Sequence, residues 1–303
     1  MEEITDFSRL TACLSGQGRR LTVAVVCGTD VSTREAVLWA VRDGFVRAVF
    51  VGGTDVPPVD DDDEVAPYVR HVPAAGAEEA ARKAVAMVRA GEADVLMKGL
   101  LNTDVLLHAV LDKECGLLPP GNVLTHLAAA EIPGRDRLLF MTDVAVIPYP
   151  TPVQRRAQVD YAVRICRALG IGVPRIALVH CSEKPGDKFP HTLDYLDMRR
   201  EAAAGRWGEV LMDGPLDVRT ACDAGALRLK GIVSPLEGRA DVLVFPDIEA
   251  GNTFYKTITC FAQASVAGML QGASCPVVLS SRGDTSASKY YSLALAVIAA
   301  QVR

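Results

Sequence analysis

The 303-residue sequence has few aromatic residues, no excess of positive charge and no long apolar run. Aromatic side chains make up 6% of the chain and its formal charge is −5, so neither the stacking surface nor the basic surface of a nucleic-acid-binding protein is expected. The apolar stretch at residues 293–300 is far shorter than the roughly 20 residues that cross a bilayer. We therefore expect a protein that binds neither nucleic acid nor membranes.

Closely spaced cysteine pairs are also lacking. None of the eight cysteines forms a C-x-x-C pair, which zinc sites and redox motifs usually need. The first six residues, MEEITD, are acidic where a secretory signal would be basic and then apolar. These features predict a cytoplasmic protein with free, mostly buried thiols and without a metal site.

The chain does have the composition of a globular protein, with 50% hydrophobic and 23% charged residues and enough length for about two domains. Short apolar, β-branched runs predict strands at 21–27, 46–51, 93–97, 138–147, 175–180, 209–212, 241–245 and 276–280. Helical patterns lie between them, at 32–42, 77–90, 103–111, 152–169, 192–204, 218–226, 253–270 and 287–301. Ser32, with Glu35 three residues later, is expected to cap the first of these helices. The alternation predicts a doubly wound α/β fold with mostly parallel strands.

Three predicted strands are followed by segments that combine a cation, a glycine and small polar side chains. These segments are KGLLNT at 98–103, PDIEAGNTFYK at 246–256 and SRGDTS at 281–286, whereas DGPLD at 213–217 is acidic. Ligands of open α/β sheets bind beyond the carboxyl ends of the strands, where helix N-termini favour anions. The three segments therefore predict a polyanion site.

Two interpretations of the second segment remain open. If Gly251 precedes a helix, Asn252 and Lys256 lie on the same helix face and could reach one bound group. Alternatively, Asn252 only caps that helix and Lys256 is solvated. The sequence contains no phosphate-binding P-loop, no dinucleotide fingerprint after the first strand and no G-x-S-x-G motif. His180 and His191 match no standard metal spacing, so we expect them to be structural.

Several of these segments together resemble the phosphate acetyl/butyryltransferase family. The resemblance rests on LMKGL at 96–100 with Thr103, DGPLD at 213–217, PDIEAGN with Tyr255 and Lys256, and PVVLSSR at 276–282. It extends from about residue 21 to the end of the chain, and G-N-x-x-Y-K is its most specific element. The segment 98–117 is more similar to the butyryl branch than to the acetyl branch.

The resemblance implies an isocitrate/isopropylmalate dehydrogenase-like fold of two α/β domains with a cleft between them, usually as a homodimer. Residues 1–134 and 272–303 would form the first domain and residues 135–271 the second. The implied reaction is acyl-CoA + phosphate ⇌ acyl phosphate + CoA, with CoA as a substrate and with no tightly bound cofactor or metal. A butyryl or similar short chain is expected in preference to acetyl.

Residue roles also follow from the resemblance. Ser281 is similar to the family serine that donates a hydrogen bond to the developing oxyanion, and Arg282 to the arginine whose planar guanidinium holds phosphate. The substrate-binding positions would be Lys98, Thr103, Asp213, Asn252, Tyr255 and Lys256.

The resemblance leaves two alternatives for the catalytic base. The acetyl branch has a candidate base, an aspartate, seven residues after the serine, where this chain has Ser288. Either Asp284 takes the proton of the CoA thiol, or CoA is oriented without a dedicated base. Asp284 could instead cap the helix expected to begin near Ser286.

Three other functions remain open at this point. The protein could be a phosphate acetyltransferase, or a metal- and NAD-dependent dehydrogenase of the same broad fold. It could also be a non-catalytic protein that binds CoA esters, an alternative that Ser288 keeps open.

Overall fold

The computed structural model describes residues 3–53, 64–281 and 283–302. The chain divides into two compact units. The flanking unit comprises Phe7–Leu124 and Val266–Arg303, and the central unit comprises Met1–Asp6 and Thr125–Ser265. The boundaries expected from the sequence, after residues 134 and 271, differ from these by two strands that were not predicted, β5 (Thr125–Glu131) and β10 (Ser265–Gln271).

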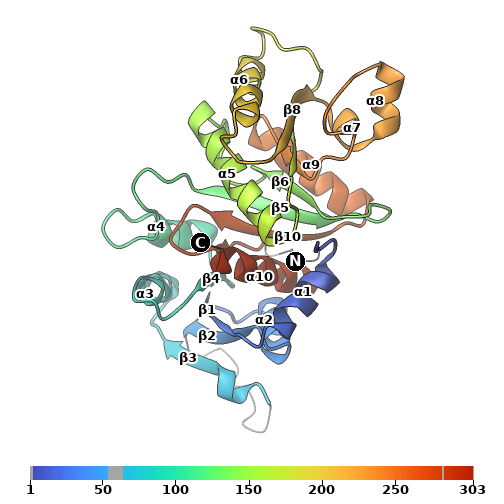
Figure 1. The fold of residues 1–303 in the computed structure, drawn as a ribbon. Coiled ribbons are helices and arrows are strands. Elements are labelled where there is room, and N and C mark those ends of the chain that lie inside the picture. Colours follow the sequence, from blue (N-terminus) through green and yellow to red (C-terminus); the bar gives the residue numbers. More distant parts are fainter. Residues whose placement is uncertain (1–2, 54–63, 282, 303) are drawn as a thin grey trace. The chain divides into compact units, whose positions relative to one another are not determined.

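The flanking unit contains strands in the order β3-β2-β1-β4-β11-β10. Neighbouring strands are parallel except for β10 and β11. Besides β10, its strands are β1 (Leu21–Val26), β2 (Val46–Gly52), β3 (Val69–Pro73), β4 (Val95–Lys98) and β11 (Val277–Val278). The helices are α1 (Phe7–Gly16), α2 (Val31–Arg42), α3 (Ala77–Arg89), α4 (Thr103–Leu111) and α10 (Ser286–Gln301), with a 3₁₀ turn, η1, at Ala66–Tyr68. Figure 1 shows how these elements follow one another.

The central unit contains strands in the order β5-β6-β9-β7-β8, parallel except for β5 and β6. Its other strands are β6 (Leu139–Thr142), β7 (Arg175–Val179), β8 (Leu211–Leu216) and β9 (Val242–Val244). Its helices are α5 (Pro152–Ala168), α6 (His191–Ala203), α7 (Val218–Cys222), α8 (Ala224–Lys230) and α9 (Ile248–Phe261). Buried apolar residues on β6, β7 and β9 form the core, so the predicted mixed α/β fold with mostly parallel strands is confirmed.

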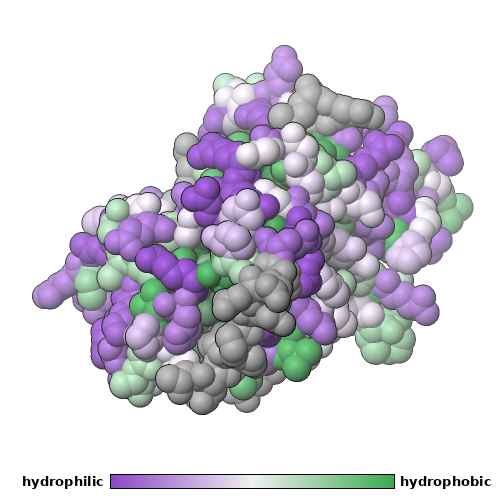
Figure 2. Space-filling model, turned by 90° about the horizontal axis from the view of Figure 1, so that it is seen from below, coloured by the Kyte–Doolittle hydropathy of each residue, from purple (hydrophilic) through white to green (hydrophobic). Residues whose placement is uncertain are grey.

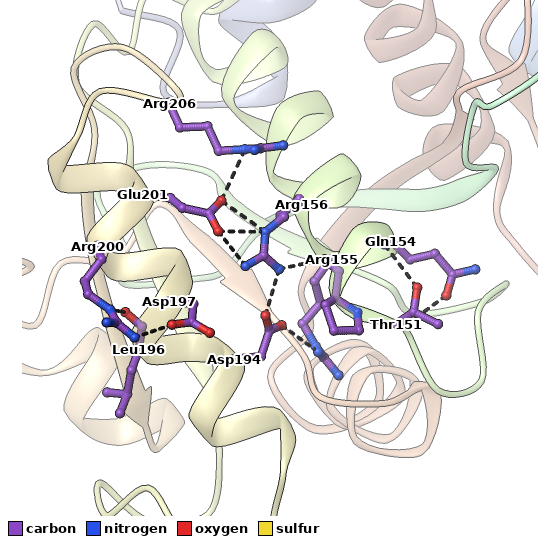
Figure 3. Close-up of polar contacts among 11 residues, drawn as sticks. Thr151, Gln154, Arg155, Arg156, Asp194, Leu196, Asp197, Arg200, Glu201 and Arg206 are labelled. Atoms are coloured by element: carbon purple, nitrogen blue, oxygen red, sulfur yellow. Dashed lines mark hydrogen bonds and ion pairs between the residues drawn. The ribbon is translucent and has the colours of Figure 1, made fainter.

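An arginine–carboxylate network joins α5 to α6 (Figure 3). Arg156 donates to both carboxylate oxygens of Glu201, at 2.6–3.0 Å, and to Asp194 at 2.7 Å. Arg155, whose side chain is only 6% exposed, also pairs with Asp194 at 3.0 Å. The hydrogen bond from Arg156 lowers the pKa of Glu201. Because two-pronged guanidinium contacts fix both distance and angle, the network sets how α6 lies on α5.

A buried ion pair fixes α10 against α2 in the flanking unit. Lys289 is 3% exposed, and its ammonium contacts Asp30 at 2.9 Å and the hydroxyls of Ser32 and Thr33 at 2.8 and 2.9 Å. Asp30, and not Ser32 as predicted, caps α2 by accepting the N–H of Thr33. Burial opposes ionisation of the Asp30 carboxyl, but hydrogen bonds from Lys289, Thr33 and Ser32 outweigh it and lower its pKa from 3.8 to about 2.

Removing the Asp30 charge should therefore destabilise the protein in a pH-dependent way. The folded-state pKa lies below the unfolded one, so the stabilisation is complete above about pH 5 and is lost as the pH falls toward 2. We expect Asp30→Asn to lower the free energy of unfolding by on the order of 2 kcal/mol at pH 7, with a smaller loss below pH 4. Urea unfolding between pH 3 and 7, followed by the fluorescence of Trp39 on α2, measures this. Asp197→Asn, at an exposed ion pair on α6, is the control and should change little. A loss of stability at Asp30 that does not vary with pH would contradict the prediction.

Several sequence-based assignments are wrong or incomplete, among them the strand expected over 138–147, which ends at Thr142. The helix expected over 253–270 begins earlier, at Ile248, and ends at Phe261, and residues 265–271 form β10 instead. The helix expected over 218–226 is two helices, because Asp223 ends α7 and caps α8 through the N–H groups of Gly225 and Ala226. Strands β3, β5 and β10 and helix α1 were not predicted. β5 has the sequence THLAAAE, whose small residues do not give a strand pattern on their own.

The structure also shows the state of the cysteines and the character of the surface. All eight cysteines lie in described residues and are free, as predicted, but only Cys166 and Cys275 are buried, so the expectation of mostly buried thiols is wrong. No helix in the described part of the chain is long and apolar enough to cross a membrane. On the face drawn in Figure 2, hydrophilic residues predominate and hydrophobic ones form small separate patches.

Candidate functional site

The carboxyl ends of β4 and β11 bring two predicted site segments together in the flanking unit. The two strands are parallel neighbours, with Leu96 opposite Val277 and Met97 opposite Val278. Lys98 is 3% exposed, and its ammonium donates to the carbonyl oxygens of Gly99 and Ser280, at 3.3 and 3.5 Å. The segments KGLLNT and SRGDTS therefore begin side by side, as their positions after two strands predicted.

Gly99 allows the chain to pass close to β1 at this point. A Cβ at residue 99 would lie 2.4 Å from the carbonyl oxygen of Cys27. The chain then reaches Thr103, the half-buried first residue of α4, which has the predicted bounds. Lys98 and Thr103 thus stand at the end of a strand and at the start of the next helix.

A tight loop after β11 holds the predicted catalytic residues. The backbone N–H of Ser281 donates to a carboxylate oxygen of Asp284 at 2.7 Å, and the N–H of Gly283 donates to the Ser281 hydroxyl at 3.4 Å. Since that hydroxyl accepts the Gly283 N–H, its own proton can be donated elsewhere. Arg282 lies outside the described residues.

Asp284 does not cap the helix that follows it. Thr285 caps α10, accepting the N–H of Ser288 at 3.1 Å, so the capping alternative for Asp284 is wrong. The hydroxyl of Ser288 donates to the carbonyl oxygen of Val266 at 2.7 Å and ties α10 to β10. The acetyl branch has an aspartate at this position. Here the position is a serine, and its hydroxyl proton is donated to the backbone of β10.

The G-N-x-x-Y-K motif lies on α9 in the central unit. Asp247 caps this helix by accepting the N–H of Ala250, so Gly251 lies inside the helix and does not precede it, and Asn252 is not the cap. Instead, Asn252 donates from its side-chain amide to the carbonyl oxygen of Val144 at 2.8 Å. Both interpretations of Asn252 drawn from the sequence placed the helix start too late.

Gly251 is required by a close backbone contact. A Cβ at this position would lie 2.2 Å from the carbonyl oxygen of Asp143, in the loop after β6. The exposed Lys256 has its ammonium 5.3 Å from the centre of the Tyr255 ring. Asn252, Tyr255 and Lys256 are thus presented by one helix that is seated on the 143–146 loop.

That loop is organised by a residue that the sequence did not single out. Asp143 is 1% exposed and accepts four hydrogen bonds, from the Thr125 hydroxyl and from the backbone N–H groups of His126, Ala145 and Val146. It is a positioning residue for α9, because Gly251 and Asn252 both contact the loop that it holds. The sequence feature that could have indicated Asp143 is its place directly after the buried strand β6.

Asp213 lies within a strand and not after one. Strand β8 extends to Leu216, beyond the predicted end at 212, so Asp213 is a buried strand residue with 6% exposure. Its carboxylate pairs with Arg199 of α6 at 3.1 Å, and Arg199 also donates to the carbonyl oxygen of Gly214 at 3.2 Å. Arg199 is a second contributor that the sequence did not indicate, because the contact joins residues far apart in the chain.

The close contact at Gly251 leads to a prediction for the position of α9. Gly251→Ala should force α9 away from the 143–146 loop and lower the free energy of unfolding by about 1–3 kcal/mol, as overpacking of a close contact usually does. Urea unfolding measures the effect. Gly172→Ala, where an added Cβ has no neighbour within 4 Å, is the matched control and should leave stability nearly unchanged. Equal stability of the two variants would show that the contact at Gly251 relaxes without cost.

The sequence is similar to those of known proteins over most of the chain. Residues 72–297 match the family model described as phosphate acetyl/butaryl transferase. A phosphate butyryltransferase of Clostridium acetobutylicum is 36% identical over 288 residues, which cover 92% of this chain and 93% of that protein. A phosphate acetyltransferase of Thermotoga maritima is 32% identical over 299 residues, or 96% and 98% of the two chains.

Solved structures of related proteins have a similar fold. A branched-chain phosphotransacylase from Enterococcus faecalis superposes with a TM-score of 0.80 at 28% identity, over 93% of this chain and 100% of that one. A 4-hydroxythreonine-4-phosphate dehydrogenase from Klebsiella pneumoniae gives a TM-score of 0.54 at 13% identity, over 93% and 100%, and is alike in fold alone.

The fold and the polar strand ends define a mixed α/β protein with hydrogen-bonding groups beyond the carboxyl ends of β4 and β11 in the flanking unit and of β9 in the central unit. The chain belongs to the phosphate acetyl/butyryltransferase family, as the resemblance of its motifs predicted. It is accordingly a phosphate acyltransferase.

Proposed function

We propose that the protein interconverts short-chain acyl-CoA and phosphate with acyl phosphate and CoA, using the loop 281–284 as its catalytic segment. The observation that carries this proposal is the Ser281–Asp284 hydrogen bond of 2.7 Å, formed beside the buried ammonium of Lys98. A hydroxyl, a carboxylate and a cation then stand at the ends of two adjacent strands, where α/β sheets bind anionic ligands.

The chemistry toward acyl-CoA needs a base, an oxyanion donor and a phosphate holder. Asp284 takes the proton from the CoA thiol, since a free thiol is mostly protonated at neutral pH. The thiolate attacks the acyl carbonyl carbon, and the Ser281 hydroxyl donates to the oxygen that becomes negative. The tetrahedral intermediate then breaks its bond to the phosphate oxygen, and Arg282 holds the departing phosphate through parallel hydrogen bonds.

The remaining predicted residues would bind the substrate. Lys98 and Thr103 belong to the flanking unit, and Asp213, Asn252, Tyr255 and Lys256 to the central unit. Their joint action requires the two-domain arrangement with a cleft that the family resemblance implies, and this arrangement is part of the proposal. So are a homodimeric state, a cytoplasmic location and the lack of a tightly bound cofactor.

A thiol-release assay tests the function directly. The purified protein, butyryl-CoA and phosphate should release CoA thiol at a rate that depends on phosphate, and sulfate in place of phosphate should not support release. Reduction of NAD with a phosphorylated hydroxy compound, and no thiol release, would favour the dehydrogenase alternative. Silence in both assays, together with saturable binding of butyryl-CoA, would favour a non-catalytic CoA-ester-binding protein.

The length of the acyl chain is a separate prediction. We expect kcat/KM to peak at a four-carbon or similar branched chain, because segment 98–117 is more similar to the butyryl branch. Each methylene that fills or leaves an apolar pocket changes kcat/KM by roughly 10–200-fold. Acyl-CoA substrates of two to six carbons, assayed with the same phosphate concentration, measure the profile. An optimum at acetyl would contradict the butyryl preference and leave the acyltransferase function intact.

A further inference from the structure

Helix α9 has few buried side chains to hold it in place. The structure describes all 14 of its residues, Ile248–Phe261, and only Gly251 and Ile258 among them are buried. Helices at the surface of globular proteins usually bury an apolar stripe along their length. Because a glycine has no side chain to pack, we expect polar contacts to fix the N-terminal half of α9.

The segment 143–149, which follows β6, makes these polar contacts and is here called the α9 clamp. Its Pro148 carbonyl oxygen accepts the N–H of Ile248 at 2.9 Å. The hydroxyl of Tyr149 donates to the carboxylate of Glu249 at 2.6 Å. With the contacts of the Gly-Asn pair at 251–252 described above, four of the first five residues of α9 lie against the clamp.

The carboxylate of Asp143 fixes the α9 clamp to strand β5. Its oxygen Oδ1 accepts the backbone N–H groups of Ala145 and Val146, both at 2.8 Å, and so shapes the turn at the start of the clamp. Its oxygen Oδ2 accepts the hydroxyl of Thr125 at 2.6 Å and the N–H of His126 at 3.0 Å, both from β5. The two oxygens of one side chain thus join the clamp to the sheet.

The hydroxyl of Thr125 is the one side-chain group among the four donors that the structure records for this carboxylate. Thr125 and Asp143 are both 1% exposed. A short hydrogen bond to a carboxylate is among the stronger ones in proteins, and a buried acceptor that loses its donor is costly. Thr125 is therefore the residue through which a substitution can weaken the hold on the clamp without altering the clamp itself.

We propose that Thr125 is a positioning residue for the face of α9 that carries Tyr255 and Lys256. Its hydroxyl holds Asp143, Asp143 holds the clamp, and the clamp holds the turn of α9 that immediately precedes Tyr255 and Lys256. The buried hydroxyl touches no substrate, so it acts on the reaction only through the helix. The effect on the reaction rests on the proposed function, in which Tyr255 and Lys256 bind the substrate, whereas the effect on α9 does not.

Hydrogen exchange of the intact protein, read by mass spectrometry, tests the position of α9 without any catalytic readout. Thr125→Val keeps the shape of the side chain but removes its donor. The amides of residues 248–256 should exchange about 5- to 150-fold faster in this variant, as expected for the loss of one hydrogen bond to a buried carboxylate. Thr125→Ser keeps the hydroxyl and should restore slow exchange. The amides of α6 should exchange alike in all three proteins.

Thr192→Val is the matched control in the same unit. Thr192 is also fully buried, and its hydroxyl also donates at 2.6 Å, but to the carbonyl oxygen of Phe189 at the start of α6. Urea unfolding should show that the two valine variants are folded and both less stable than the wild type. The exchange of residues 248–256 should be faster in Thr125→Val alone, which separates a specific effect on α9 from a general loss of stability.

Tyr149→Phe tests the other end of the clamp. Tyr149 is 71% exposed, so its replacement leaves the core intact. The variant loses the hydrogen bond to Glu249, and the amides of residues 248–256 should exchange about two- to tenfold faster. This variant keeps the role of the clamp testable even if Thr125→Val does not fold.

A double-mutant cycle with Lys256 tests the effect on the reaction. Thr125→Val should lower kcat/KM for butyryl phosphate and CoA, and Lys256→Ala should do so as well. If Thr125 acts by placing Lys256, adding Thr125→Val to Lys256→Ala should cause little further loss, so that the two losses fall short of additivity by about 2- to 150-fold. Thr192→Val should retain a kcat/KM close to that of the wild type.

The possible outcomes separate this inference from the proposed function. Unchanged exchange of residues 248–256 in Thr125→Val, or an equal increase in Thr192→Val, would overturn the role of Thr125 in positioning α9. Losses of kcat/KM that are fully additive with Lys256→Ala would show that Thr125 does not act through Lys256. A wild-type protein that releases no thiol would contradict the proposed function, and the exchange measurements would still decide whether Thr125 positions α9.

Discussion

Replacing Asp284 with Asn should lower kcat for acyl-CoA synthesis by roughly 10²–10⁴ at pH 7, the usual range for a lost general base. The side-chain oxygen of Asn can still accept the N–H of Ser281, which lies 2.7 Å from the carboxylate, so the loop should keep its geometry. The deficit should shrink as the pH approaches about 8.5, where the CoA thiol ionises without help. Measuring kcat for both proteins from pH 6.5 to 9 tests this.

A second variant separates the base from the hydrogen-bond acceptor. Asp284→Ala removes both functions, so it should be at least as slow as Asp284→Asn, and its deficit should remain at high pH. If Asp284 only holds the Ser281 N–H, Asp284→Asn should have a nearly normal kcat at pH 7 while Asp284→Ala is slow. That result would exclude Asp284 as the base and leave CoA oriented without one.

Ser281→Ala should lower kcat by about 10²–10³ at every pH, because an oxyanion donor is lost and no titrating group is involved. In the structure the Ser281 hydroxyl accepts the Gly283 N–H, and its own proton can be donated to the substrate. The KM for acyl phosphate should change much less than kcat, since the hydrogen bond strengthens only as the oxygen becomes negative. Steady-state assays with butyryl phosphate and CoA measure both constants.

Two further variants make this prediction specific. Ser281→Thr keeps a hydroxyl and should retain much more activity than the alanine variant. Ser286→Ala removes a nearby hydroxyl that donates to Glu35 at 2.6 Å, and it should leave kcat nearly unchanged. Equal activity of Ser281→Ala and the wild type would place the oxyanion donor elsewhere.

The regular elements of the fold were largely predictable because each carries its own pattern. The apolar run at 21–26 gives β1, and the bounds of α4 at 103–111 were predicted without error. The failures arise where the local pattern is missing or misleading. β5 has no strand pattern of its own, whereas β10, SVAGMLQ, continues the apolar character of α9 and is identified as a strand by its pairing with β11.

The candidate site, too, was predictable from the sequence only in part. The segments after β4, β9 and β11 were recognisable from the sequence because each combines a strand end with a cation, a glycine and small polar residues. The contacts that these residues make in the fold were not recognisable from the sequence. That Asn252 holds Val144, that Asp213 pairs with Arg199 and that Asp143 accepts four hydrogen bonds all depend on residues distant in the chain.

The sequence by itself thus determined the α/β class, the family and the residue types available for acyl transfer, because these depend on local periodicity and on short motifs. Only the tertiary structure decided which groups meet. It seated Gly251 against the Asp143 carbonyl, gave the helix cap to Thr285 and left Asp284 to the Ser281 N–H. Hydrogen bonds and pockets arise from the packing of segments far apart in the chain, and no local pattern specifies them.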